Sequence, residues 1–302
     1  MIQQRFSSAR VRVFVGLILA SGLGLQAQRA WSNRAEETSP RSSVAAPVKH
    51  AGNVAFAAPA RETANPALTL EARAAKDPLG VLQMALDRYD RSVRDYTCTF
   101  TKQELVNGKL TQEQVMRAMF REKPFSVRLE WTQNADKCSR VLYVADKWLE
   151  KGRQMAVVEP AGAIAQLFVS YVMRPIDGED ARKSSRRTID QFGLRNSLLL
   201  TLKYCQLAAE KKILDLAFKG TSKIGERPTL VFERRLPYTG DDGFWPDRVL
   251  VVHLDRELLL PVLCEAFADD QKTRLLGRYQ SSDIELNSNL PDATFTKEGM
   301  GL

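Results

Sequence analysis

The stretch from Arg248 to Phe295 restricts the fold more than any other part of this 302-residue chain. It contains three apolar segments of strand length, separated by a break at Asp255 and by a polar turn at residues 269–272. Apolar segments joined by short turns are typical of an antiparallel meander. We therefore expect strands over residues 249–254, from Pro261 onward and after the polar turn, followed by a loop that leads to Phe295.

A helix is predicted ahead of the strands. Asp77 can cap it and Pro78 suits its first turn, and the predicted helix ends near Tyr96. Its apolar residues recur at steps of three and four, which places them on one face. They are Leu82, Ala85, Leu86, Tyr89 and Val93.

Alternating residues after this helix predict more strands. Residues 96–101 alternate with a period of two, and Asn107-Gly108 is a strong hairpin signal. With the C-terminal meander, the pattern predicts about ten or eleven strands. The other segments that we expect to be strands are 112–121, 125–131, 140–145, 154–158, 214–218 and 230–235.

Two helices are expected to interrupt the strands, one over the apolar residues 160–173 and one over the amphipathic residues 195–212. Between them lies a mixed charge cluster, residues 177–187. Its four bases could contact anionic lipid headgroups, or they could belong to a solvated loop. These bases are Arg182, Lys183, Arg186 and Arg187.

Two local patterns resemble the lipoprotein-carrier superfamily, which includes the LolA and LolB proteins and RseB. One is Tyr96-x-Cys-x-Phe after the first helix. The other is the order of features in the C-terminal meander: Asp255, Leu260-Pro261, a tyrosine, Asp-x-x-x-Asn and Asp-x-x-Phe. The nearest branch that we can suggest within that superfamily is a domain of unknown function.

This resemblance covers about residues 77–298 and implies an α+β fold. The expected fold is a strongly curved, incompletely closed antiparallel β-barrel of about 10–11 strands, with an N-terminal helix and further helices covering the concave face. We expect one carrier-like domain over residues 77–302.

The first 76 residues are expected to lie outside that domain. Arginines, an apolar run over residues 13–25 and then small residues give the order of a secretory signal, so we expect a signal peptide over residues 1–30. The apolar run is short of the ~20 residues that span a bilayer, which makes a retained anchor the weaker alternative. Residues 31–76 are rich in Ala, Ser, Pro and Thr and are expected to form a flexible linker. The protein is therefore expected to be exported to the periplasm or cell envelope.

The net charge of +8 does not indicate nucleic-acid binding. Most of the excess lies in the first 76 residues, and residues 77–302 carry 34 basic and 32 acidic residues. A domain so close to neutral lacks the basic surface that nucleic-acid binding requires.

The sequence predicts no catalytic, metal or cofactor site. A zinc site would need cysteines that are close in sequence, and none are. The two histidines are His50, in the linker, and His253, on a predicted strand, and no Gly-x-Ser-x-Gly motif accompanies them. No glycine-rich phosphate loop is present.

The four cysteines leave two possibilities open. An exported chain could join them in two disulfides, but their apolar neighbours suit buried free thiols equally well. They are Cys98, Cys138, Cys205 and Cys264.

Aromatic and apolar residues on the early strands could share the concave face, with part of the apolar stretch 160–173 as a lid. In a half-open barrel too wide for side chains to fill, they would line an apolar cavity; packed against helices, they would form a closed core. The candidate strand residues are Tyr96, Phe100, Phe120, Phe125, Leu129, Trp131 and Tyr143, and the candidate lid residues are Leu167, Phe168 and Tyr171.

The resemblance implies a monomeric, non-catalytic binding protein that holds a lipid or the acyl chains of a lipoprotein. The alternative is an interaction or sensing module that uses the same surface to contact an envelope protein.

Overall fold

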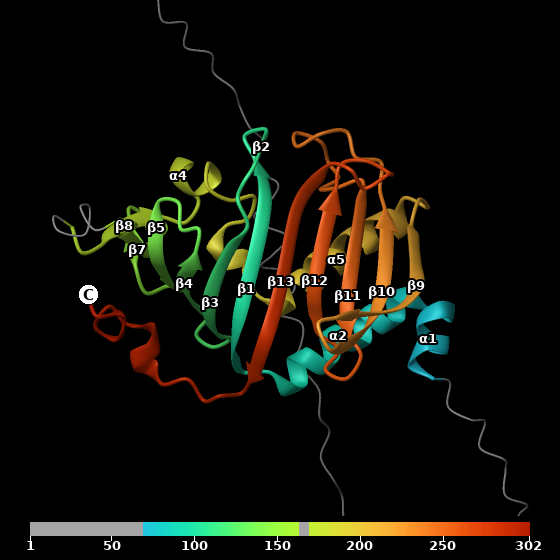
Figure 1. The fold of residues 1–302 in the computed structure, drawn as a ribbon, viewed down its shortest axis with the longest axis horizontal. Helices are drawn as coiled ribbons and strands as arrows, with labels where there is room; N and C mark the ends of the chain where they lie inside the picture. The colour runs from blue at the N-terminus through green and yellow to red at the C-terminus, as the bar shows by residue number, and fades with distance from the viewer. Residues whose placement is uncertain (1–68, 163–168) are drawn as a thin grey trace, which may run out of the picture. The chain divides into compact units, whose positions relative to one another are not determined.

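The computed structural model describes residues 69–162 and 169–302, which form an α+β fold (Figure 1). One antiparallel sheet of 13 strands curves without closing, which confirms the predicted fold class. The sheet has more strands than the ten or eleven expected, and two of them, β2 (Lys109–Leu110) and β6 (Leu149–Glu150), are only two residues long. The expected signal peptide and most of the expected linker lie outside the described residues.

The remaining strands are long enough to form continuous ladders. They are β1 (Asp95–Val106), β3 (Gln114–Arg121), β4 (Ser126–Gln133), β5 (Cys138–Val144), β7 (Arg153–Pro160), β8 (Val172–Pro175), β9 (Asp215–Ile224), β10 (Arg227–Arg235), β11 (Val249–Asp255), β12 (Pro261–Phe267) and β13 (Leu275–Leu286).

The first and last long strands meet in the middle of the sheet. The order is β6-β7-β5-β4-β3-β1-β13-β12-β11-β10-β9, with β2 beside β1 and β8 beside β7. The predicted meander is present as β11, β12 and β13, and β13 pairs with β1 along most of its length. Figure 1 shows the two strands side by side. The sheet therefore consists of two meanders joined at one seam.

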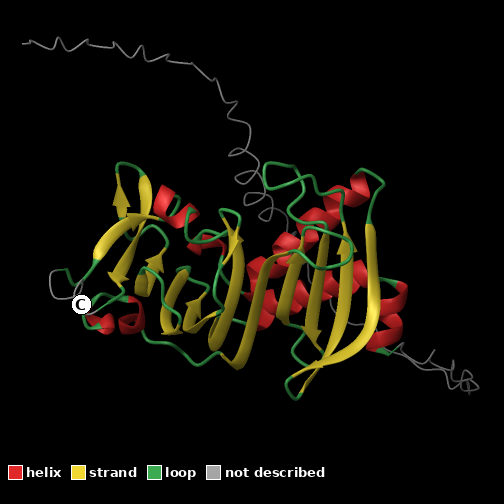
Figure 2. Cartoon of the chain, turned by 45° about the horizontal axis from the view of Figure 1, so that its top comes forward, coloured by secondary structure: helices red, strands yellow, loops and turns green. Residues whose placement is uncertain are grey.

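Three helices pack on one face of the sheet, here called the inner face; the opposite face is the outer face. They are α1 (Leu70–Lys76), α2 (Pro78–Ser92) and α5 (Leu194–Glu210). Figure 2 shows the long helices gathered on one face of the β9–β13 half. The Asp77 side chain accepts a hydrogen bond from Gly80 N at 2.8 Å, so α2 starts where the sequence predicted.

Helix α1 corrects the expected boundary of the linker. The predicted linker ended at residue 76, but Thr69 caps a helix that follows it directly, and Ala74 is fully buried. Leu70 packs against the core formed by α2, α5 and strands β10–β12. The ordered domain therefore begins before Asp77.

The predicted apolar helix over residues 160–173 is wrong at both ends. Strand β7 runs to Pro160, and Val172 and Met173 belong to β8. Residues 163–168 lie outside the described part of the chain. Val172 pairs with Val158, so residues 172–175 add strand β8 to the sheet.

The C-terminal segment covers the outer face of β3, β5 and β7. Its short 3-10 helices, η2 (Asp292–Phe295) and η3 (Glu298–Met300), bury Phe295 and Met300 among apolar residues of those strands. Arg128 on β4 donates to the carbonyl oxygens of Thr294 (3.1 Å) and Gly299 (2.8 Å). Basic side chains of the outer face thus satisfy carbonyl groups of the segment that covers it.

Candidate functional site

The first row of the inner face is fully buried. Strand register pairs Tyr96 with Phe120, Phe120 with Val127, and Val127 with Tyr143, so the four side chains lie side by side across β1, β3, β4 and β5. Each is at most 4% exposed. Burial raises the pKa of Tyr143 to about 12, which keeps its phenol neutral.

Aromatic rings fill the space above this row. Tyr96 stacks on Phe120 with ring centroids 4.8 Å apart, and Phe125 meets Phe120 edge-on at 5.2 Å. Phe192 contacts both Phe100, at 5.0 Å, and Phe120, at 6.2 Å. Phe192 follows the 3-10 turn η1 (Ile189–Gln191) and was not among the predicted residues.

The N-terminus of α5 closes the same region. Leu194 is 3% exposed within this cluster, and its N–H donates to the Tyr96 hydroxyl at 3.2 Å. Gly193 has φ +115°, and a Cβ there would lie 3.2 Å from both Phe120 Cε2 and the Tyr96 hydroxyl. Only glycine allows this close approach. Around Tyr96 and Phe120, the inner face is therefore a closed core.

The second row opens toward the edge of the sheet. The register runs through six strands, from Cys98 on β1 to Val172 on β8. The first three side chains are at most 8% exposed, whereas the last three are half buried. The six residues, in order, are Cys98, Ala118, Leu129, Val141, Val158 and Val172. We call Val141, Val158 and Val172 the valine row.

Trp131 borders this row. It lies on the inner face opposite Met116, two residues from Leu129, and is half buried. Its indole nitrogen is buried and has no hydrogen-bond partner among the described residues. An unpaired buried donor is costly, so an acceptor that reached this nitrogen would be favoured.

The predicted site residues divide into four groups. Tyr96, Phe120, Leu129 and Tyr143 are buried in the core, while Phe100, Phe125 and Trp131 are half buried beside them. Leu167 and Phe168 lie outside the described residues.

Tyr171 is the exception, because it lies on the outer face. It packs with the cluster under the C-terminal segment, and its hydroxyl accepts a hydrogen bond from Lys297 Nζ at 2.9 Å. The structure does not bring it to the other seven candidates among the described residues.

The charged insert is fixed to the sheet rather than free. The Glu104 carboxylate accepts hydrogen bonds from Ser185 Oγ at 2.8 Å and Arg186 N at 3.3 Å. The Arg186 guanidinium pairs with Asp241 at 2.9 Å. Arg186 is therefore engaged within the protein, which removes it from the basic patch considered for lipid headgroups. Glu179–Arg182 form the short helix α4.

The four cysteines and His253 lie on strands of the sheet or on α5. All four cysteines lie in the described residues as free thiols, and burial raises the pKa of Cys98 and of Cys264 to about 12. His253 Nδ1 lies 3.2 Å from Thr229 Oγ1, and burial lowers the pKa of the imidazole. These groups are part of packed strands or helices.

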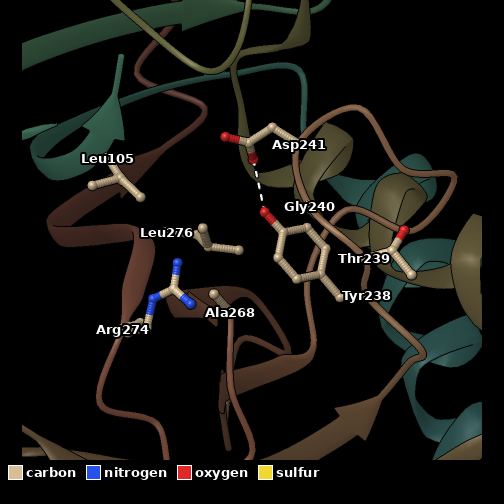
Figure 3. A pocket seen from close by; sticks show the side chains of 8 residues that line it. All are labelled: Leu105, Tyr238, Thr239, Gly240, Asp241, Ala268, Arg274 and Leu276. Atoms are coloured by element: carbon tan, nitrogen blue, oxygen red, sulfur yellow. Dashed lines mark hydrogen bonds between the residues drawn. The ribbon is translucent and has the colours of Figure 1, made fainter. Parts of the chain in front are cut away.

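A separate cavity of about 430 Å³ lies at the rim of the sheet (Figure 3). Its walls come from the end of β1, the start of β13 and the loop after β10, and include residues 238–241, Leu105, Ala268, Arg274 and Leu276. None of the eight predicted site residues that the structure describes lines it.

Within the described residues, no helix has the length and apolar character needed to cross a membrane.

A family model described as "Protein of unknown function (DUF1571)" matches residues 93–299. No curated protein matches the chain.

Several solved structures are similar to this chain. A DUF1329 family protein from Desulfovibrio piger is 14% identical, with 74% of this chain and 98% of that chain covered and a TM-score of 0.38. Lipoprotein LppX from Mycobacterium tuberculosis is 12% identical, with 71% and 98% covered and a TM-score of 0.37. The Pseudomonas aeruginosa MucA/MucB complex gives 16% identity, 73% and 60% coverage and a TM-score of 0.41, so this chain spans less than two thirds of that matched chain.

LolA superfamily proteins are also among the similar structures, as the predicted resemblance implied. With TM-scores below 0.5, none of these likenesses says what this chain binds.

Proposed function

The chain belongs to the DUF1571 family, and from the inner face of its sheet we propose that it is a non-catalytic binding protein of the cell envelope, which holds a lipid or the acyl chains of a lipoprotein against the valine row.

The observation that carries this proposal is the change in burial along one cross-strand row. Leu129 is 8% exposed and lies in the core, whereas the next three partners, Val141, Val158 and Val172, are only half buried. They continue a packed apolar surface without a break in register. An acyl chain laid on this row would extend the core, and each methylene taken fully out of water contributes ~0.8 kcal/mol.

The chemistry of the row supports binding rather than catalysis. Its side chains are valines, with Leu129 on one side and the Trp131 indole nearby. None of these groups is an acid, a base or a nucleophile. The indole N–H can donate to an ester or amide carbonyl, which is the group that joins an acyl chain to its head group.

The location is proposed from the N-terminus. Residues 1–30 have the charged, apolar and small-residue order of an export signal. An exported protein meets membrane lipids and lipoproteins, which would supply acyl chains to the row.

The direct test is to extract lipid from protein purified from its native envelope without detergent, and to identify it by mass spectrometry. We expect bound lipid or acylated peptide in near-stoichiometric amount. We expect V158D to lose it, because a carboxylate in the middle of the row would be desolvated by an acyl chain.

A matched control is V231D, which places the same charge at a half-buried valine on the outer face of β10, opposite His253. Circular dichroism checks that both variants keep the fold. A wild-type protein that is empty, and that also fails to take up a fluorescent fatty acid, would overturn the proposal.

One observation favours a second candidate function, a protein-interaction module. The valine row ends on β8, which pairs only with β7 among the described strands, so β8 is an edge strand that a partner's strand could extend. A photoreactive amino acid at exposed Arg174 on β8 distinguishes the two, since protein adducts would favour the module and lipid adducts the carrier.

A further inference from the structure

The rim cavity offers a site that differs in chemistry from the valine row. It lies where β1 ends at Val106 and β13 begins at Leu275, next to the loop that joins β10 to β11. Its volume of about 430 Å³ falls within the usual range for small-molecule sites, about 300–1,000 Å³.

One part of its wall is apolar. Leu105, Ala268 and Leu276 come from three different strands or strand ends, and Leu276 is 1% exposed and fixed in the core. Figure 3 shows the Tyr238 ring facing these side chains across the space. The wall could take up a short hydrocarbon group.

The cavity also contains one acid that is already paired. Asp241 accepts a hydrogen bond from the Tyr238 hydroxyl at 2.9 Å and pairs with Arg186 at 2.9 Å. Burial acts to raise the pKa of Asp241, but the bonds from Arg186 and Tyr238 outweigh it and lower the pKa below its ordinary value. The carboxylate therefore stays ionised, and its charge is balanced by Arg186.

The Arg274 side chain, by contrast, is exposed and has no ion-pair partner among the described residues. The main-chain N–H of this residue is held by Asp269 Oδ2 at 2.7 Å, which fixes the backbone, whereas its side chain extends into the cavity (Figure 3). Among the described residues, no carboxylate or carbonyl group bonds this guanidinium. A planar guanidinium matches a carboxylate or phosphate with two parallel hydrogen bonds.

We propose that the rim cavity binds a small organic anion, a carboxylate or phosphate monoester with a short apolar group. Arg274 binds the anionic head, and Leu105, Ala268 and Leu276 contact the apolar group. This site is independent of the valine row, and its proposal does not rest on the proposed function.

Isothermal titration of the full-length chain with octanoate and octyl phosphate tests the proposal. We expect both to bind, and R274Q to weaken both by about tenfold or more, because a hydrogen-bonded charge pair is lost. R91Q is the matched control: Arg91 is exposed on α2, outside the cavity, and we expect its affinities to stay within about twofold of wild type.

Further probes separate the two parts of the site. Neutral octyl glucoside should bind much more weakly than octanoate, and inorganic phosphate more weakly than octyl phosphate. A268W should abolish binding by filling the cavity, with circular dichroism to confirm the fold, while V158D should bind as wild type.

Equal affinities for R274Q and R91Q, or no binding of either octyl anion, would overturn the proposal. Phosphate binding as tight as octyl phosphate would remove the apolar part of it.

Discussion

The hydroxyl of Tyr279 donates a 2.8 Å hydrogen bond to Oε1 of Glu104, although the two residues are 175 positions apart in the chain. Glu104 is 1% exposed on β1, and it also accepts bonds from Lys102 at 3.0 Å and from Ser185. One carboxylate therefore joins the two strands of the central seam to the charged insert. Burial and the neighbouring Glu104 raise the pKa of Tyr279 well above its ordinary value, so the phenol remains a donor.

Replacing Glu104 with alanine should release the insert from the sheet. The substitution removes the acceptor for Ser185 and Arg186 N and leaves the Tyr279 hydroxyl buried without a partner, at about 1–3 kcal/mol for each such group. We expect faster amide exchange over residues 184–187 by mass spectrometry, and a lower urea midpoint. E113A is the control, since Glu113 is 49% exposed and 3.7 Å from Arg278; a similar effect there would contradict the role of Glu104.

The buried pair Arg234–Asp247 should be sensitive to removal of one partner. Arg234 donates to both Asp247 oxygens at 2.9 Å, and the two side chains are 2% and 4% exposed. R234M would leave a buried carboxylate without its partner, and we expect a loss of about 3–5 kcal/mol in the free energy of unfolding.

The double variant R234M/D247L should recover much of this loss, because it leaves no uncompensated charge. R153Q breaks an exposed pair, Arg153–Asp177, and should cost less than about 1 kcal/mol in the same urea titrations. Equal losses of unfolding free energy for R153Q and R234M would show that burial does not determine how much the Arg234–Asp247 pair contributes to stability.

Gly193 should not tolerate alanine. The substitution forces a side chain into φ +115° and places a Cβ against Phe120 and Tyr96, so we expect a loss of roughly 1–3 kcal/mol from backbone strain plus a cost for moving the rings. Gly220 provides the matched control, with φ +99° and nothing within 4 Å of the position that a Cβ would take. Thermal unfolding should show G193A less stable than G220A; equal values would mean that ring contact adds nothing.

The stability should fall in acid partly through Glu233. Burial acts to raise the pKa of this carboxyl, but hydrogen bonds from Lys272, at 2.9 Å, and Arg235, at 2.7 Å, lower it below its ordinary 4.5. The unfolded chain then binds a proton more readily than the folded one, so this contribution is present above about pH 4.5 and is lost as the pH falls through the folded pKa.

Urea titrations between pH 6 and pH 3 check this, and E233Q should show a smaller decrease in unfolding free energy than wild type. The same substitution at exposed Glu226 is the control. An unchanged pH dependence in E233Q would contradict the assignment.

The fold was predictable where local signals agree with tertiary structure. The turn residues Asn107 and Gly108 both have positive φ, as the hairpin signal required, and the Asp77 cap marked the start of α2. Helix α1 was missed because its sequence, LEARAAK, is short and has Leu70 as its one large apolar residue, and because it depends on contacts with α2 and β9. The ends of the apolar stretch 160–173 were predicted as helix because periodicity alone cannot distinguish helix from strand in a short apolar run. Pro160 belongs to β7, and Val172 and Met173 belong to β8.

For the candidate site, the sequence predicted only which face of the sheet carries the side chains. A period of two places Tyr96, Phe120 and Trp131 on the same side of the sheet. The same periodicity cannot show that α5 and Phe192 cover Phe120, because this cover depends on the packing of a helix that comes 70 or more residues later in the chain. It also cannot show that the valine row, at the far end of the next row, is only half buried. Tyr171 was predicted on the inner face with the other candidates for a related reason. It is one position from Val172, and this single step puts it on the outer face.

The central seam also governs when the fold can be completed. When the chain emerges N-terminus first, β1 appears early and β13 appears almost last. The edges that meet at the central seam, one from each meander, therefore stay unpaired until nearly the whole sequence is available. Pairings over such distances form slowly, and unpaired edges invite contacts with other chains. On the export route proposed above, the two halves of the sheet can join on the far side of the membrane only after β13 has crossed it.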